Sequence, residues 1–341
     1  MDLWQPERVY FEPTAKDTIV GRRIQQYCEE HNVPILETTS HNQVRDLPGK
    51  DEKSKYAAAK KTLIVGTKRS MKLDPCRSSA DYQFSLMTNC PGTCEYCYLF
   101  STQGKKPYVR VYVNMEELFQ TIDKYIEKKL PHATVFEAAS TGDPLGVEHI
   151  TGTLKDTIIH FGKLQKGKLR VVTKYSNVDG LLDIPHNNHT RFRFSINSNY
   201  VIKNFEHNVS NLWDRLRAAG KMAEAGYPLG FIIAPIMLHE NWKQEYKELL
   251  EGLHRQLGAK SDSFIPFELI QHRFTMNAKN IIEERYPNTK LDMDPEKRIK
   301  KWGKYGRTKY VYPKEEAQEA KEYISNLIKD MFPHGHIQYF T

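Results

Sequence analysis

Residues 89–99 read NCPGTCEYCYL, so Cys90, Cys94 and Cys97 follow one another at the spacing C-x3-C-x2-C. The Pro-Gly pair between the first two cysteines favours a turn, because glycine adopts backbone angles that other residues avoid. The segment is therefore too tightly turned to form one regular helix. Three thiolates on such a loop can hold three irons of a [4Fe–4S] cube and leave the fourth iron open to a substrate or cofactor.

Two other interpretations of these cysteines stay open. A structural zinc site normally has four protein ligands, and Cys76 could supply the fourth. The loop lacks the paired C-x2-C knuckles of such sites. A disulfide with one spare thiol is the other alternative.

The motif resembles the radical S-adenosylmethionine (SAM) superfamily, in which an aromatic residue precedes the last cysteine. Together with FEAASTGDPLGVEH at residues 136–149, it resembles the spore photoproduct lyase family. The resemblance runs from about residue 80 onward and is weaker before it. It implies that Cys90, Cys94 and Cys97 hold a [4Fe–4S] cluster whose open iron binds SAM. The reduced cluster would split SAM to a 5′-deoxyadenosyl radical.

The composition indicates a protein with a sizeable hydrophobic core and a large hydrated surface. Of 341 residues, 39% are hydrophobic, and no apolar run approaches the roughly 20 residues of a membrane span. The first residues lack the features of a secretory signal. Five cysteines without a paired framework favour a reducing cytoplasm. The net charge of +8 favours a polyanionic partner, although a basic protein without a nucleic-acid role has the same charge.

Strands and helices alternate after residue 80, as in parallel β/α construction. About six such units fall short of the eight of a complete barrel. The predicted fold is therefore α/β, an open partial (β/α)6 barrel of the TIM type, which is also what the resemblance implies. The predicted domains are an α/β N-terminal extension over 1–79, the barrel over 80–275, and a basic hairpin with a helix over 276–341. Predicted elements include strands at 62–67, 82–87, 229–237 and 264–270, and helices at 115–129, 149–164, 205–225, 241–257 and 314–332.

Small and polar residues at the ends of the predicted strands are candidate SAM contacts. Radical SAM enzymes usually have a glycine-rich motif with an acid after the second strand, where this chain has Gly142 and Asp143 in Thr-Gly-Asp-Pro. This departs from the usual two glycines and a glutamate. Each candidate also fits a solvated or core position. The full set is Tyr96, Tyr98, Gly142, Asp143, Lys174, Ser195, Asn197 and Ala234.

Ser140 departs from the family at a catalytic position. Spore photoproduct lyases carry a cysteine at this strand end, which returns a hydrogen atom to the substrate radical. A thiol is a good hydrogen-atom donor, whereas the stronger O–H bond of serine makes it a poor one. The resemblance implies that Tyr98 relays the hydrogen atom during this return step and that Tyr96 is a further residue of the same relay. Ser140 also fits a small residue that ends a strand.

A basic segment, KRIKKWGKYGRTKY at 297–310, holds seven basic residues and three aromatics. Its Lys-Tyr-Gly centre between strand-like flanks suits a hairpin tip. Basic groups neutralise phosphates, and aromatic rings stack on bases. An exposed amphipathic hairpin without a partner is the alternative. The candidate DNA contacts are Lys301, Trp302, Lys304, Tyr305, Arg307, Lys309 and Tyr310.

The resemblance implies a DNA repair lyase that reverts 5-thyminyl-5,6-dihydrothymine to two thymines. Its partners would be double-stranded DNA carrying this lesion and an electron donor such as flavodoxin or ferredoxin. Its location would be the cytoplasm of the spore core or germinating cell. The alternatives are a radical SAM enzyme acting on RNA or a peptide, and a non-catalytic metal-containing nucleic-acid-binding protein.

Overall fold

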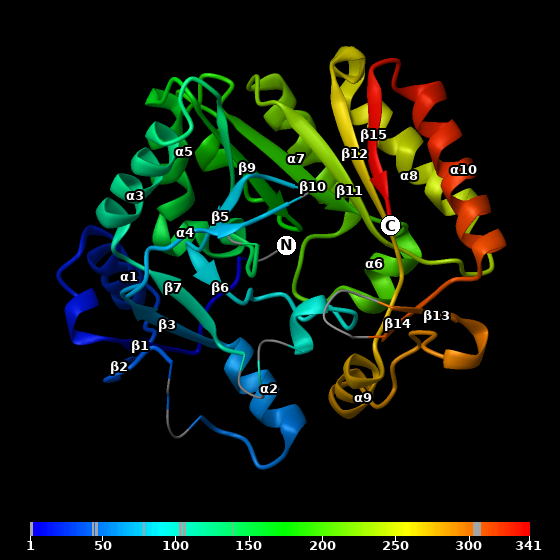
Figure 1. The fold of residues 1–341 in the computed structure, drawn as a ribbon. Helices are drawn as coiled ribbons and strands as arrows, with labels where there is room; N and C mark the ends of the chain where they lie inside the picture. Colours follow the sequence, from blue (N-terminus) through cyan, green and yellow to red (C-terminus); the bar gives the residue numbers. More distant parts are fainter. Residues whose placement is uncertain are drawn as a thin grey trace. The chain divides into compact units, whose positions relative to one another are not determined.

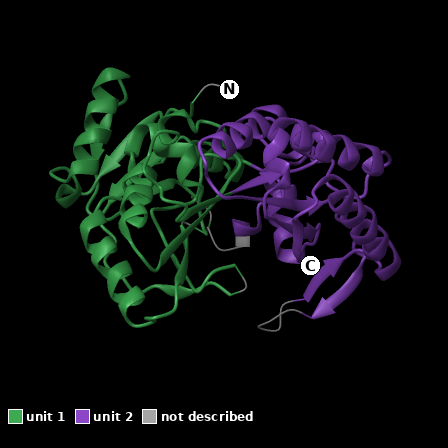
Figure 2. Cartoon of the chain, turned by 90° about the horizontal axis from the view of Figure 1, so that it is seen from above, with its two compact units in different colours: residues 1–93, 103–192 green, residues 94–102, 193–341 purple. Residues whose placement is uncertain are grey.

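The computed structural model describes residues 3–42, 44, 47–77, 79–101, 104, 107–138, 140–302 and 308–341. The chain divides into two compact units, which Figure 2 colours separately. Unit 1 comprises residues 1–93 and 103–192, and unit 2 comprises residues 94–102 and 193–341. Cys90 therefore belongs to unit 1, and Cys94 and Cys97 belong to unit 2.

The first sheet of unit 1 has the strand order β2-β1-β3-β7-β6 (Figure 1). Its strands are parallel except for β6, which is antiparallel to β7. Every residue of β3 is buried, as is typical of a central parallel strand. The bounds are β1 Arg8–Phe11, β2 Ile35–Glu37, β3 Thr62–Gly66, β6 Met87–Thr88 and β7 Val109–Tyr112. Two helices of this part are α1 Ile19–Glu30 and α2 Glu52–Lys60.

The second set of strands in unit 1 has the order β4-β5-β8-β9. β5, β8 and β9 are parallel, and α5 packs against β9 (Figure 1). The phenylalanines of this layer form a ring cluster in which Phe136 contacts Phe84 and Phe161. The bounds are β4 Asp74–Pro75, β5 Tyr82–Phe84, β8 Thr134–Ala138, β9 Gly167–Thr173, α3 Met115–Glu127, α4 Glu148–Thr151 and α5 Thr153–Lys163.

Unit 2 continues the alternation of strands and helices. β10 enters unit 2 at Arg193, and the order from there is β10-β11-β12-β15. β11, β12 and β15 are parallel, while β13 and β14 form a separate antiparallel hairpin. The strands are β10 Thr190–Ile196, β11 Leu229–Ile236, β12 Ile265–Gln271, β13 Ile299–Trp302, β14 Thr308–Val311 and β15 Gly335–Phe340. The helices are α6 Asn199–Phe205, α7 Leu212–Glu224, α8 Trp242–Leu257, α9 Met276–Arg285 and α10 Lys314–Met331.

Several predicted elements are confirmed, namely strands β11 and β12, helices α8 and α10, and the basic hairpin. Two predicted helices are wrong in extent. The helix predicted over 149–164 is interrupted at Gly152, whose φ of 66° ends α4 before α5 begins. The helix predicted over 205–225 starts later than predicted, because α6 ends at Phe205 and Asn211 caps the start of α7 at Leu212. No helix among the described residues has both the length and the apolar character needed to cross a membrane.

Candidate active site

The cysteine loop begins in unit 1 directly after β6. Asn89 has a φ of 60°, and its side-chain amide donates to the backbone oxygen of Tyr108 at 2.9 Å. The Nζ atom of Lys60 donates to the backbone oxygen of Cys90 at 2.8 Å, and Lys60 is buried. The backbone at Cys90 is therefore fixed from two sides, with a buried ammonium group beside it.

The second part of the loop, in unit 2, is a tight turn. The amide of Cys97 donates to the oxygen of Cys94 at 3.2 Å, and a 3-10 helix, Tyr98–Ser101, follows. The amide of Glu95 donates to the oxygen of Phe205 at 2.9 Å. The structure thus confirms that this segment is not one regular helix.

Tyr96 and Tyr98 have different surroundings. The hydroxyl of Tyr96 donates to Glu206, whose carboxylate also pairs with Arg215. Burial and the negative charge of Glu206 raise the pKa of Tyr96 well above its usual range, so the phenol keeps its proton. Tyr98 is 75% exposed. Glu206 and Arg215 could not be identified from the sequence, because no motif links them to the loop.

The segment after β8 lies against the start of the cysteine loop within unit 1. The amide of Asn89 donates to the oxygen of Thr141 at 2.7 Å. A Cβ atom on Gly142 would lie 2.8 Å from the Met87 side chain and 2.9 Å from the Asn89 oxygen, so only glycine allows this approach. The Ser140 hydroxyl donates to the side chain of Gln83 on β5.

Asp143 and Lys174, two predicted SAM contacts, are brought together in unit 1. The Oδ2 atom of Asp143 accepts from the backbone amide of Lys174 at 2.7 Å. Asp143 is buried, and it directly precedes the 3-10 helix Pro144–Val147. The arrangement fixes the carboxylate at the carboxyl ends of β8 and β9, where parallel strands commonly place ligands.

Of the predicted contacts in unit 2, Ser195 lies on β10, Asn197 directly follows β10, and Ala234 lies on β11. Ser195 is buried, and its backbone oxygen accepts from Arg215 at 2.9 Å. Asn197 is fully buried, with its amide donating to Pro235 at 2.7 Å and its oxygen accepting from Tyr246 at 2.9 Å. Ala234 is half-buried on β11. Asn197 thus has an internal structural role, and its contact with SAM stays a prediction.

Some of the predicted DNA contacts on the basic hairpin are exposed to solvent. Lys301 is exposed and Trp302 is 79% exposed on β13. Tyr310 instead stacks on Phe274 at 5.2 Å, and Lys309 is half-buried. Lys304, Tyr305 and Arg307 lie outside the described residues.

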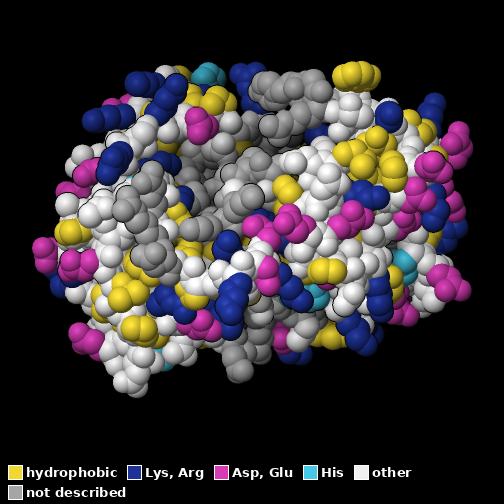
Figure 3. All heavy atoms as spheres, turned by 90° about the horizontal axis from the view of Figure 1, so that it is seen from below, with side chains coloured by type: hydrophobic (Ala, Val, Ile, Leu, Met, Phe, Trp, Pro, Cys, Tyr) yellow, Lys and Arg dark blue, Asp and Glu magenta, His cyan; other side chains and the backbone are white. Residues whose placement is uncertain are grey.

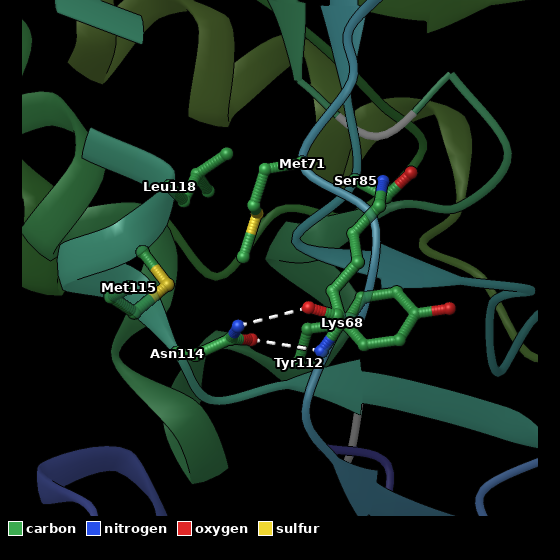
Figure 4. Close-up of a pocket in the computed structure, with 7 residues that line it drawn as sticks. All are labelled: Lys68, Met71, Ser85, Tyr112, Asn114, Met115 and Leu118. Carbon is green, nitrogen blue, oxygen red and sulfur yellow. Dashed lines mark hydrogen bonds between the residues drawn. The ribbon is translucent and has the colours of Figure 1, made fainter. Parts of the chain in front are cut away.

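One pocket in unit 1 lies apart from these predicted residues. It lies at the carboxyl ends of β3 and β7, where Asn114 binds the backbone of Lys68 through its amide and its oxygen (Figure 4). Its lining comprises Lys68, Met71, Ser85, Tyr112, Asn114, Met115 and Leu118. None of the residues predicted to contact SAM or the cluster lines this pocket.

The cysteines suit a cube with an open iron. No three His, Cys, Asp or Glu side chains within the described ranges are already gathered as a metal site. The donor set nevertheless has the right chemistry, with three thiol groups on one short turn-rich loop. The buried Lys60 ammonium group beside Cys90 also favours an anionic cluster.

Comparison with known proteins identifies the family. The family model described as "Spore photoproduct lyase" matches residues 4–341. The chain is 50% identical over 336 residues to the spore photoproduct lyase of Bacillus subtilis (strain 168), covering 98% of each chain. It is also 50% identical over 341 residues to that of Geobacillus sp. (strain Y412MC61), covering 100% of each.

A solved structure gives the same result for the fold. A double mutant of spore photoproduct lyase with bound AdoMet and dinucleoside spore photoproduct superposes with a TM-score of 0.95, at 50% identity and with 100% of both chains covered. The α/β architecture, with its parallel strands and helices, is thereby that of a partial TIM-type barrel. The chain therefore belongs to the spore photoproduct lyase family of radical SAM enzymes.

Proposed function

We propose that this enzyme repairs DNA by reverting the spore photoproduct, 5-thyminyl-5,6-dihydrothymine, to two thymines. The observation that carries the proposal is the full-length match, at 50% identity, to a lyase whose solved structure holds AdoMet and the dinucleoside lesion. The cysteine loop and the Gly142-Asp143 turn provide the matching local chemistry.

In this proposal Cys90, Cys94 and Cys97 hold three irons and leave the fourth for SAM. When bound, SAM and the reduced cluster supply the 5′-deoxyadenosyl radical that removes a hydrogen atom from C6 of the lesion. Asp143 would accept hydrogen bonds from the SAM amino group, and its contact with the Lys174 amide orients it for this. The Lys174 side chain would then bind the SAM carboxylate.

Replacing Asp143 by asparagine is expected to raise the KM for SAM by roughly tenfold. The change removes one charge-assisted hydrogen bond, worth about 1.5 kcal/mol, while the amide of Lys174 keeps an oxygen acceptor. SAM titration with 5′-deoxyadenosine as the product measures it. Asp81→Asn is the matched control, because Asp81 also accepts from a backbone amide, that of Val135, at the start of β8. Equal KM values in the two variants would place the SAM amino group elsewhere.

We further propose that the basic hairpin, residues 299–311, contacts DNA. Trp302 and Lys301 support this, since both are exposed on β13. On the face drawn in Figure 3, lysine and arginine side chains are interspersed with acidic ones. Exposed aromatic and basic side chains on one strand suit phosphate contact combined with base stacking. Tyr310 would support the hairpin through its stacking on Phe274 rather than bind DNA.

Trp302→Ala is expected to weaken lesion-DNA binding by about 1–3 kcal/mol, the usual worth of one base–aromatic stack. Lys301→Glu should instead weaken the salt dependence of DNA binding. Each lost phosphate contact reduces the slope of log binding constant against log salt concentration by about 0.9. Fluorescence anisotropy over a range of salt concentrations separates the two effects. Lys321→Glu, the same charge change on the exposed face of α10, is the control. If all three variants bind like wild type, the DNA site lies elsewhere.

Anaerobic reconstitution with iron and sulfide tests the function as a whole. SAM and a reductant are then added to DNA that carries the lesion, and thymine and 5′-deoxyadenosine are measured. Lesion-dependent thymine formation is the expected result. Turnover on RNA or a peptide with none on the lesion would overturn the proposal. Replacing the chemical reductant by flavodoxin or ferredoxin tests the proposed class of electron donor.

A further inference from the structure

A fully buried arginine in unit 2 connects three separate segments. The side chain of Arg215, on α7, has no exposed surface. Its Nε atom donates to the oxygen of Ser210 at 2.8 Å, and its Nη1 atom donates to the oxygen of Ser195 at 2.9 Å. Its Nη2 atom pairs with Glu206, whose side chain is equally buried. The guanidinium group therefore has hydrogen-bond partners in three directions.

Glu206 extends this connection to the cysteine loop. One of its carboxylate oxygens binds Arg215, and the other accepts from the Tyr96 hydroxyl. The neighbouring Phe205 accepts from the amide of Glu95. Backbone and side-chain contacts thus hold two consecutive loop residues, both between Cys94 and Cys97.

The Glu95 side chain makes a second attachment. Its carboxylate contacts the ring of His207 at 2.8 Å and accepts from the Thr289 hydroxyl. Glu95 is itself buried, although it lies in a loop. The turn from Cys94 to Cys97 is therefore held by Phe205 and His207, the two residues that flank Glu206 in the sequence.

We propose that Glu206 and Arg215 are positioning residues that set the cysteine turn relative to the end of β10, where Ser195 lies. This inference rests on the proposed function, because it takes the turn as a holder of the cluster. Partners that orient metal ligands typically affect metal affinity by 10- to 100-fold. In this role Glu206 acts through the Tyr96 hydroxyl, and Arg215 acts through Glu206 and the backbone of Ser195.

The chain contains a matched control for a purely stabilising role. Arg193 and Glu268 form another buried ion pair in unit 2, and the Tyr339 hydroxyl donates to Glu268. The combination of arginine, glutamate and tyrosine is the same, but no cysteine adjoins this tyrosine in sequence. Any effect that comes only from weakening a buried ion pair should appear in both places.

Glu206→Gln and Glu268→Gln separate the two roles. Both variants should lower the melting temperature of the cluster-free protein. Only Glu206→Gln should lose iron to a chelator about tenfold faster and need about tenfold more SAM to change the electron paramagnetic resonance spectrum of the reduced cluster. If Glu206→Gln does not fold, Tyr96→Phe, which leaves the ion pair intact, should also lose iron to the chelator faster than wild type. Iron retention is the readout for this variant, because Tyr96 is itself a predicted SAM contact.

The outcomes distinguish this inference from the proposed function. If wild type holds iron and Glu206→Gln matches Glu268→Gln in iron retention and SAM requirement, the positioning role is wrong. The same follows if Glu206→Gln does not fold and Tyr96→Phe retains iron like wild type. A wild-type chain that holds no iron would overturn the proposed function and this inference with it.

Discussion

Replacing any one of Cys90, Cys94 and Cys97 by alanine is expected to remove most of the bound iron and all SAM cleavage. A cube held by two thiolates has a second iron without a protein ligand, so it is labile and cannot reserve a single open iron for SAM. The effect should be similar for all three residues, because each supplies one of three equivalent ligands. Iron and sulfide analysis, visible absorption and 5′-deoxyadenosine formation after anaerobic reconstitution measure it.

The two remaining cysteines provide the controls. Cys28 is buried in α1, and burial raises its pKa to about 11, so its thiol stays protonated at neutral pH and is a poor ligand. Cys28→Ala should therefore keep its iron. Cys76→Ala should also keep it, whereas a zinc site with Cys76 as the fourth ligand would lose its metal. Full iron content and turnover in all three loop variants would refute the assignment of the cluster.

Local patterns explain what the sequence could predict about the fold. α8 and α10 have regular apolar spacing, and the basic hairpin is a short antiparallel contact between neighbouring segments. In contrast, β7 pairs with β3, which lies more than forty residues earlier in the sequence. The residues of neither strand indicate which other strand it pairs with. The break at Gly152 depends on one left-handed residue within an otherwise periodic stretch. The sequence pattern alone did not distinguish that break from a continuous helix.

In the candidate site, too, local motifs could be predicted from the sequence, whereas contacts between distant residues could not. The cysteine spacing and the Gly142-Asp143 turn are local motifs, so they could be read directly from the sequence. The pairing of Tyr96 with Glu206 joins residues 110 positions apart, and only the fold shows it. Likewise, the residues that surround the Asn197 amide lie on other elements. Residue type and strand position predicted where these side chains lie but could not predict which partners they have.

Ser140→Cys is expected to change the products of the repair reaction. The early steps need SAM, the cluster and the C6 hydrogen of the lesion, and none of these depends on residue 140. The thymine radical left after bond cleavage must then receive a hydrogen atom. From a thiol it takes the S–H hydrogen and leaves a sulfur radical, whereas abstraction from the stronger serine O–H is energetically uphill. In this chain that hydroxyl also donates to Gln83, which holds its hydrogen away from other acceptors.

Wild type should therefore give thymine adducts with the reductant and uncoupled SAM consumption. Ser140→Cys should suppress the adducts and restore catalytic use of SAM. Mass spectrometry of products from labelled lesion, for both forms, measures the distribution. Ser140→Ala is the matched control, because it removes the hydroxyl without adding a thiol and should resemble wild type. If Ser140→Cys and wild type give the same clean thymine yield per SAM, residue 140 is not the hydrogen donor, and the exposed Tyr98 becomes the first group to test in its place.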